Sequence, residues 1–400
     1  MAYGLLKSWF LNDSMRKMLF VAIIVLSSIA SAADITAFLS PDRSYDALTD
    51  FLGGKELKIA SYTFDSANIA KELIKLDANI TLLVEASPVG GLQDKEILCE
   101  LEKNGIAVYL YNGSVRFMHA KYMVKGSAVL VTTENFGSSG FGDCKGSRGW
   151  GAIVKDARIA EEFSDIFEED LKSSARFVCD INNYEINYEE SDTCQPAFGI
   201  NNYQNQQVNA IFAPDAAPAV LDLINSSKKA IYIEQFYIYR YWDNNKPNLF
   251  LETVINKARE GLEVKILLDS TWYHLAKDDK NSNLNTAEHI NKIAKDENLS
   301  LEARLADMQA IGVSELHVKG IIIDNKTVFV SSINWNENSP RNNREAGVVI
   351  TGNAAEYFAK AFMYDWNGGK IADNTDIKWL ILVIVTLALV VVFVFSRRRK

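Results

Sequence analysis

The pattern histidine–x–lysine occurs twice in this sequence, each time in an apolar run that is typical of a buried strand. His119 and Lys121 begin HAKYMVKG, and His317 and Lys319 begin HVKGIIID. Alternate residues of a strand point to the same side, so each histidine projects beside its lysine. This combination suits chemistry at phosphorus, because the ammonium group binds anionic oxygens while the imidazole attacks phosphorus or protonates a leaving oxygen.

A matching asparagine follows each copy of the pattern. Asn135 lies in TTENF and Asn334 lies in SSINW, 199 residues apart (334 − 135), and the two histidines are 198 residues apart (317 − 119). Chance often produces one His-x-Lys, whereas two copies in register with two asparagines indicate a duplicated phosphate-binding unit. If the two halves pack face to face, the imidazoles, ammonium groups and amides form one anion site.

The doubled pattern resembles the signature of the phospholipase D superfamily, H-x-K-x(4)-D used twice, including that of its cardiolipin synthase-like members. The second copy is complete with Asp324, and Ser332 and Glu345 also match the family pattern. The first copy is degenerate, because Gly126 stands in place of the aspartate and Gly149 stands at the place that corresponds to Glu345.

This resemblance, which covers most of residues 35–368, implies roles for these groups. A histidine attacks phosphorus to form a phosphohistidine, and no metal or cofactor is needed because the lysines supply the positive charge. The aspartate of one motif orients the histidine of the other lobe, so Asp324 is expected to support His119 as nucleophile, with His317 as general acid. The expected catalytic residues are His119, Lys121, His317, Lys319 and Asp324. The expected phosphate- or substrate-binding residues are Asn135, Asn334, Ser332, Glu345 and Glu234.

Two interpretations of the degenerate first half stay open. Either the protein is active, since both histidines, both lysines and both asparagines are kept, or the loss of two carboxylates leaves a non-catalytic surface binding protein. The remaining histidines, His274 and His289, have no counterpart in the other half and are expected at the surface.

The elements that must position these residues are also duplicated. In each half, apolar strand patterns alternate with segments of helical periodicity. The strand patterns are 57–62 and 80–85 in the first half and 230–235 and 264–269 in the second. This alternation predicts an α/β fold of two pseudo-twofold-related α-β-α lobes with mixed, largely parallel sheets. Glu234 falls near the end of a predicted strand and is expected to line the cleft.

The ends of the chain predict export and a membrane anchor. Residues 15–17 (MRK) precede an apolar run and a small-residue cleavage pattern, typical of a signal peptide; an uncleaved anchor is the alternative. Residues 379–395 carry no charge and precede a cationic end, which indicates a spanning helix. The predicted order is N-terminal extension and signal peptide (1–32), first lobe (33–179), linker (180–207), second lobe (208–368), stalk (369–378), transmembrane helix (379–395) and basic cytoplasmic tail (396–400).

The cysteines agree with an exported domain. Cys99, Cys144, Cys179 and Cys194 allow three disulfide pairings, and buried free thiols are the alternative. We expect Cys179–Cys194 to close the linker, which leaves Cys99–Cys144 in the first half. The predicted location is a cell membrane, with a single span, the catalytic domain outside and the C-terminus in the cytoplasm.

This location favours a lipid substrate. A domain tethered beside lipid headgroups is expected to hydrolyse phospholipids or to transfer a phosphatidyl group to an alcohol, as cardiolipin synthases do. An exported nuclease is the alternative, although a net charge of −9 does not favour a nucleic-acid channel. Two motifs in one chain complete one site, so a monomer is sufficient.

Overall fold

The computed structural model describes residues 32–92, 95–142, 144–186, 188, 195–242 and 245–370 of the 400-residue chain. Nearly all of the predicted signal peptide, most of the stalk, the predicted transmembrane helix, the basic tail and Cys194 therefore lie outside the described residues. Among the helices within those ranges, none is both long and apolar enough to cross a membrane.

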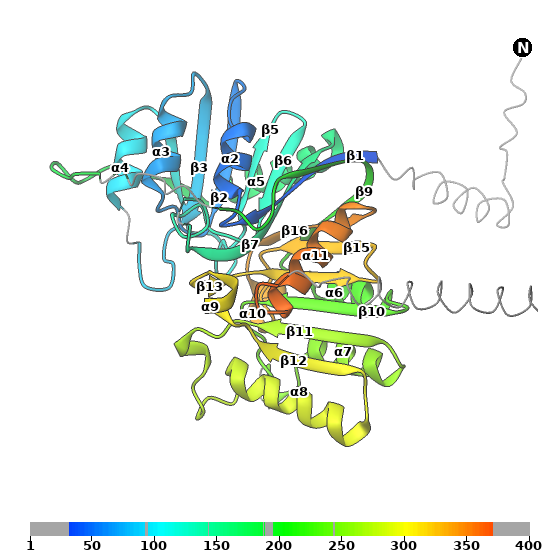
Figure 1. Cartoon of the computed structure of the whole chain (residues 1–400). Coiled ribbons are helices and arrows are strands. Elements are labelled where there is room, and N and C mark those ends of the chain that lie inside the picture. Colours follow the sequence, from blue (N-terminus) through cyan, green and yellow to red (C-terminus); the bar gives the residue numbers. More distant parts are fainter. Residues whose placement is uncertain are drawn as a thin grey trace, which may run out of the picture.

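One mixed sheet runs through both halves of the described chain (Figure 1). Its strand order is β12-β11-β10-β14-β15-β16-β9-β1-β7-β6-β5-β2-β3-β4-β8, and the short β13 pairs with β7. This order is symmetrical about the central β9–β1 pair, so each strand from β1 to β7 has a counterpart in the second half. The predicted duplication of an α/β unit is therefore visible in the strand order.

The elements of the two lobes have the following bounds. The first lobe contains β1 (Ala32–Ser40), α2 (Ser44–Phe51), β2 (Glu56–Ser61), α3 (Ala67–Ile74), β3 (Asn79–Glu85), α4 (Lys95–Lys103), β4 (Ala107–Tyr111), β5 (Tyr122–Lys125), β6 (Ala128–Thr132), β7 (Ser147–Lys155), α5 (Ala157–Lys172) and β8 (Ser174–Arg176). The second contains β9 (Asn201–Ala213), α6 (Ala217–Asn225), β10 (Ala230–Gln235), α7 (Leu249–Arg259), β11 (Glu263–Leu268), α8 (Asn283–Glu297), β12 (Leu301–Leu305), α9 (Met308–Ile311), β13 (Glu315–Leu316), β14 (Lys319–Ile323), β15 (Thr327–Ser331), α10 (Asn338–Asn342), β16 (Glu345–Thr351) and α11 (Ala354–Trp366).

Most strand pairs in this sheet are antiparallel, so the prediction of a largely parallel sheet is wrong. The outer ladders β2–β3–β4 and β10–β11–β12 are parallel, whereas β5–β6–β7 and β14–β15–β16 are antiparallel. Short turns at 126–127 and 324–326 join the first two strands of each antiparallel set, and turns of this length connect antiparallel neighbours. The apolar pattern of a strand carries no information about its direction.

Strand pairing joins the two lobes directly. β9 starts at Asn201, inside the segment 180–207 that the sequence assigned to the linker, and it pairs with both β1 and β16. The first residues of β9 are polar and mostly exposed, so the sequence shows no apolar alternation there. The ladder that continues from one lobe into the other fixes the two half-sites relative to each other.

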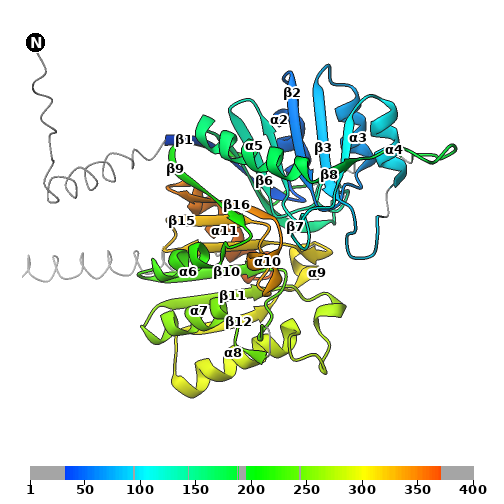
Figure 2. The ribbon, with the colours of Figure 1, turned by 180° about the vertical axis from the view of Figure 1, so that it is seen from behind.

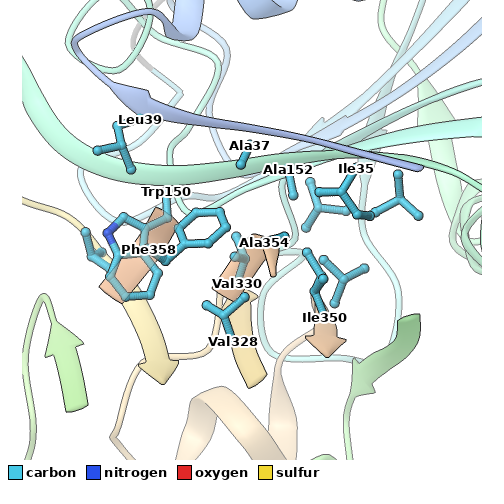
Figure 3. Close-up of a cluster of buried hydrophobic side chains, with 14 of the residues drawn as sticks. Ile35, Ala37, Leu39, Trp150, Ala152, Val328, Val330, Ile350, Ala354 and Phe358 are labelled. Carbon is cyan, nitrogen blue, oxygen red and sulfur yellow. The ribbon is translucent and has the colours of Figure 1, made fainter. Parts of the chain in front are cut away.

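An apolar core between the lobes also fixes their positions (Figure 3). Trp150 of β7 is fully buried, and its ring centroid lies 5.3 Å from that of Phe358 of α11. Helices cover both faces of the sheet (Figures 1 and 2), and α5 and α11 both pack on the central strand β9. Around Trp150, the first lobe contributes Ile35, Ala37, Leu39 and Ala152, and the second contributes Val328, Val330, Ile350, Ala354 and Phe358.

One disulfide joins Cys99 of α4 to Cys179, with the Cα atoms 4.9 Å apart. Cys144 is also disulfide-bonded. The predicted pairing of Cys99 with Cys144 and of Cys179 with Cys194 is therefore wrong. Cys99 lies on the buried face of α4, and the chain after β8 packs against the same apolar cluster, which brings Cys179 to it.

Candidate active site

The two His-x-Lys motifs meet at one cleft between the lobes, with a volume of ≈ 780 Å³. His119 and Asn135 of the first lobe and His317 and Asn334 of the second lobe all line this cleft. The structure therefore brings together four predicted site residues that lie far apart in the sequence.

Backbone pairing holds each histidine against the opposite lobe. His119 donates its N–H to the carbonyl oxygen of Arg344, and His317 donates its N–H to that of Arg148, both at 2.8 Å. The two carbonyl groups lie at the start of β16 and β7, which are equivalent strands. Each imidazole is thus placed beside side chains of the other lobe.

Two acidic side chains hold the residue before each histidine. Glu85 Oε2 accepts the N–H of Met118 at 2.7 Å, and Asp269 Oδ1 accepts the N–H of Leu316 at 2.8 Å. Glu85 ends β3 and Asp269 follows the equivalent strand β11. Asp269 Oδ2 also lies 2.8 Å from Nδ1 of His274, whose side chain is only 14% exposed, so the expectation that His274 is a surface residue is wrong.

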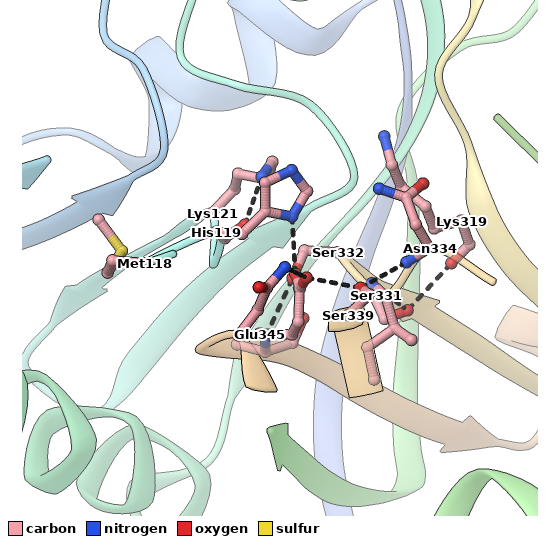
Figure 4. Close-up of polar contacts among 12 residues, drawn as sticks. Met118, His119, Lys121, Lys319, Ser331, Ser332, Asn334, Ser339 and Glu345 are labelled. Atoms are coloured by element: carbon pink, nitrogen blue, oxygen red, sulfur yellow. Dashed lines mark hydrogen bonds and ion pairs between the residues drawn. The ribbon is translucent and has the colours of Figure 1, made fainter. Parts of the chain in front are cut away.

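Glu345 of the second lobe supports His119 of the first (Figure 4). Its Oε2 lies 2.8 Å from Nδ1 of His119, and its Oε1 accepts bonds from Ser339 Oγ at 2.6 Å and Asn343 Nδ2 at 3.0 Å. Burial opposes ionisation of this carboxyl, but His119 and Lys121 outweigh it and hold the pKa of Glu345 below its usual value. The anion keeps the proton of His119 on Nδ1 and leaves Nε2 for the cleft.

Glu134 of the first lobe supports His317 of the second. Its Oε2 lies 3.1 Å from Nδ1 of His317 and accepts a hydrogen bond from Ser147 Oγ at 2.8 Å. Burial raises the pKa of Glu134 to about 7, although Lys319 and Ser147 act in the opposite direction. The sequence prediction missed this residue. Its signal was the charged residue in TTENF at the place where SSINW has isoleucine.

The two motif lysines are buried next to the histidines of their own motifs. Both are fully buried, and each Nζ donates to the carbonyl oxygen of the histidine in its own motif, Lys319 at 2.7 Å. Burial lowers the pKa of Lys319 to about 7 and the pKa of Lys121 well below its usual value. Within the described ranges, no group of three or more His, Cys, Asp or Glu side chains is placed to hold a metal ion.

The two asparagines have unused hydrogen-bonding capacity. In the described part of the chain, Oδ1 of Asn135 and Oδ1 of Asn334 are buried without a hydrogen-bond partner. The backbone N–H of Asn334 donates to Ser339 Oγ at 2.9 Å, which ties it to the residue that supports Glu345. Both asparagines line the cleft, so their side-chain amides are candidates for contact with a ligand.

Asp324 does not support His119, so that prediction is wrong. The carboxylate of Asp324 accepts the backbone N–H groups of residues 228–230 at distances from 2.7 to 3.3 Å. Asp324 follows β14, whose other end carries Lys319, and five residues of strand span roughly 16 Å. Its role is to fix the start of β10, and Glu345 takes the place beside His119.

Gly126 occupies the equivalent turn of the first lobe. Its φ is 55°, and the φ of Asp324 is also 55°. Both residues follow the strand of the motif and begin the turn to the next strand. The missing aspartate of the first motif therefore removes a turn contact and leaves the cleft unchanged.

Three predicted substrate contacts are also corrected. Ser332 Oγ is bonded to the backbone of Ala346, and Glu345 lies behind His119, so both support the site without facing ligand. Glu234 is fully buried beside Asp365 and Arg148, where burial and Asp365 raise its pKa well above the usual value. The cleft is lined instead by Phe236 and Tyr237, which follow the strand of Glu234.

Two buried arginines that the sequence prediction missed tie the lobes together. Arg148 Nε lies 3.0 Å from Asp365 Oδ2 of α11, and Arg344 Nε lies 2.9 Å from Asp170 Oδ2 of α5. Each arginine thus reaches a helix of the other lobe. Their signal was the arginine shared by SRGWG and NREAG. Removal of one partner would leave a buried charge, which typically costs about 3–5 kcal/mol.

An aromatic wall surrounds the two imidazoles. The ring centroids of Tyr62 and His119 are 4.7 Å apart, and those of Phe236 and His317 are also 4.7 Å apart. The second lobe extends this wall with further aromatic residues on the chain after β10. Those that line the cleft are Tyr237, Tyr239, Tyr241 and Trp242.

Comparison with known proteins gives one family and several similar structures. The family model described as "Cardiolipin synthase, PLD-like domain" matches residues 52–171 and 220–366. The structure of phosphatidylserine synthase from Haemophilus influenzae matches with a TM-score of 0.60 and 13% identity, over 90% of each chain. The phospholipase D family member Nuc from Salmonella typhimurium matches 41% of this chain and 97% of its own, with 23% identity and a TM-score of 0.31. No curated protein sequence matches the chain.

Proposed function

The chain belongs to the phospholipase D superfamily, and from this premise we propose that it is an active phosphodiesterase or phosphatidyltransferase that works through a phosphohistidine without a metal. One observation carries the proposal: two imidazoles line one cleft, and each is backed by a buried carboxylate from the opposite lobe. This arrangement fixes the tautomer of both rings and directs two Nε2 atoms at one substrate.

The proposed reaction has two displacements at phosphorus. Nε2 of His119 attacks phosphorus, the P–O bond to the leaving group breaks, and His317 gives its proton to the leaving oxygen. Water or an acceptor alcohol, deprotonated by His317, then attacks the phosphohistidine and releases His119. Lys121 and Lys319 neutralise the non-bridging oxygens, and a bound anion stabilises the protonated form of both lysines.

The surroundings of the two rings support this division of roles. His119 faces Glu345, whose pKa is lowered, so an anion stands behind the proposed nucleophile. Burial, Glu345 and Lys121 together leave the pKa of His119 below its usual value, so the ring is neutral and able to attack. Burial and Lys319 lower the pKa of His317 further. The negative phosphodiester opposes that shift when it binds, which is when His317 needs its proton.

We propose a phospholipid as the substrate, with the enzyme anchored to a cell membrane through residues 379–395 and its site on the outer face. The aromatic wall of the cleft suits a headgroup and the adjoining glycerol. Among the described lining residues, the cations are Arg116 and Lys280, and Glu337 adds a negative charge. A nucleic-acid channel normally has a denser basic track, and the whole chain has a net charge of −9.

The test uses the full-length protein in lipid vesicles, with chelator present. Labelled phospholipid, with and without an alcohol acceptor, and labelled oligonucleotide are offered to wild type and to His119→Ala. We expect turnover of lipid only, absent from the variant, and a phosphoryl adduct on His119 after acid quenching. Turnover of oligonucleotide would identify a nuclease, and loss of all activity in chelator would contradict a metal-free reaction.

A further inference from the structure

The two half-sites carry their supporting carboxylate at different positions of the repeat. In the second half, Glu345 starts β16 and Ile333 follows β15; in the first half, Gly149 lies in β7 and Glu134 follows β6. The ladders show that these positions correspond, because Ser331 pairs with Gly347 and Thr132 pairs with Gly151. The glutamate therefore lies at the start of β16 in the second half, but on the segment after β6 in the first half.

The side chain of Glu134 occupies the space next to Gly149. A Cβ atom on Gly149 would lie 2.4 Å from Oε1 and 2.5 Å from Cγ of Glu134, closer than side chains approach. Glycine is therefore required at this point of β7, because it leaves room for the carboxylate that arrives from the adjacent segment.

The relocated carboxylate meets its histidine in the same way as the other one. Glu134 Oε2 lies 3.1 Å from Nδ1 of His317, and Glu345 Oε2 lies 2.8 Å from Nδ1 of His119. Each carboxylate also accepts a serine hydroxyl, from Ser147 at 2.8 Å in the first case and from Ser339 at 2.6 Å in the second. Both carboxylates thus contact a histidine Nδ1 and a serine hydroxyl, through Oε2 alone in Glu134 and through both oxygens in Glu345.

We propose that Glu134 is the positioning residue of His317 and that it replaces the carboxylate missing at Gly149, so the first half-site is complete. This inference rests on the proposed function for its effect on turnover, but its geometric part does not. Glu134 holds the proton of His317 on Nδ1 and thereby aims Nε2 at the leaving oxygen.

The test restores the pattern of the second half in the first. Glu134→Gln is expected to lower kcat about 10²-fold with little change in KM, because a misoriented imidazole affects proton transfer more than binding. Gly149→Glu alone introduces a clash and is expected to unfold at lower temperature. The double variant Glu134→Ile with Gly149→Glu copies Ile333 and Glu345, and we expect its kcat to return to within about tenfold of wild type.

Glu161→Gln, an exposed residue of α5 in the same lobe, is the matched control and is expected to leave kcat unchanged. A kcat of Glu134→Gln equal to that of wild type would overturn the proposal. A folded double variant whose kcat stays as low as that of Glu134→Gln would also overturn it, because a carboxylate at position 149 would then not replace Glu134.

A second readout separates this inference from the proposed activity. In full-length protein with ¹⁵N-labelled histidine, the Nδ1–H resonance of His317 should disappear or move upfield in Glu134→Gln and return in the double variant. This result would support the positioning role even if wild type turned over no phosphodiester. An unchanged Nδ1–H resonance of His317 in Glu134→Gln would contradict the positioning role of Glu134, whether or not the protein turns over a phosphodiester.

Discussion

The half-site of His119 and the half-site of His317 differ in the surroundings of their carboxylates. Glu345 accepts hydrogen bonds from Ser339 and Asn343 as well as contacting His119, and its pKa is lowered. Oε1 of Glu134 is buried without a hydrogen-bond partner in the described residues, and burial raises the pKa of Glu134 to about 7. At neutral pH one ring therefore faces an anion and the other faces a carboxyl group that is protonated about half of the time. A symmetrical fold can thus place unequal groups around one substrate.

The largest expected effect separates the two histidines by their roles. His119→Ala should lower kcat by about 10⁴-fold or more on any substrate, because no other group forms the covalent intermediate. His317→Ala should lower kcat by about 10³-fold on a natural alcohol leaving group and much less on a nitrophenyl phosphodiester, whose leaving group needs no proton. Steady-state rates on both substrate types test this. If the nitrophenyl substrate restored the kcat of His119→Ala and not that of His317→Ala, the two roles would be reversed.

The next expected effect compares the two carboxylates. Glu345→Gln should lower kcat about 10²-fold and should also slow formation of the adduct, because the neutral amide no longer stabilises positive charge on His119. Glu134→Gln should lower kcat while adduct formation from a nitrophenyl substrate stays close to wild type. Rapid-quench measurement of the first displacement distinguishes the two. If adduct formation were slowed equally in both variants, the two histidines would not have separate roles as nucleophile and general acid.

Proton uptake on anion binding gives a smaller, pH-dependent effect. Burial lowers the pKa of Lys319 to about 7, so at pH 8 this amine is largely neutral in the free site, and burial also lowers the pKa of Lys121 well below its usual value. A bound phosphate raises both pKa values, so binding at pH 8 should take up protons, and the uptake should shrink as the pH falls below 7. Calorimetry in buffers of different ionisation enthalpy measures it.

Lys319→Arg is the matched variant, because arginine stays charged and should reduce the proton uptake. Binding without any uptake at pH 8 would mean that the lysines are already protonated before the anion binds.

The convergence of the motifs could be predicted because two copies of His-x-Lys, followed by an asparagine 16 residues after the first histidine and 17 after the second, indicate a duplicated unit whose halves share one site. The residue behind His317 could not be predicted, since the carboxylate moved from the position of Gly149 to Glu134 on a neighbouring segment. Only the packing of β6 against β7 shows that the two places are adjacent. The role given to Asp324 came from the family resemblance alone. It failed because the five residues of β14 carry the chain away from the site.

The pairing of strand β9 and the disulfide also could not be predicted from the sequence, because both depend on how distant segments pack. The polar residues of β9 lack apolar alternation because they are largely exposed, so pairing with β1 and β16 was not visible in the sequence. The four cysteines allowed three pairings, and the bond between Cys99 and Cys179 depends on how the chain after β8 packs on α4.

The smallest expected effect concerns the turn that distinguishes the two motifs. Asp324→Ala should lower the free energy of unfolding by about 1–3 kcal/mol, because it leaves the N–H groups of residues 228–230 without their acceptor. Its kcat should stay within about twofold of wild type at a temperature where the variant is folded. Gly126→Asp, which gives the first motif the family aspartate, should not raise kcat, since this turn lies at the far end of its strand from the cleft. A tenfold loss of kcat in folded Asp324→Ala would indicate a direct role for the aspartate in catalysis. The two half-sites would then differ in the aspartate of the motif, which the first half lacks, as well as in the carboxylate behind each histidine.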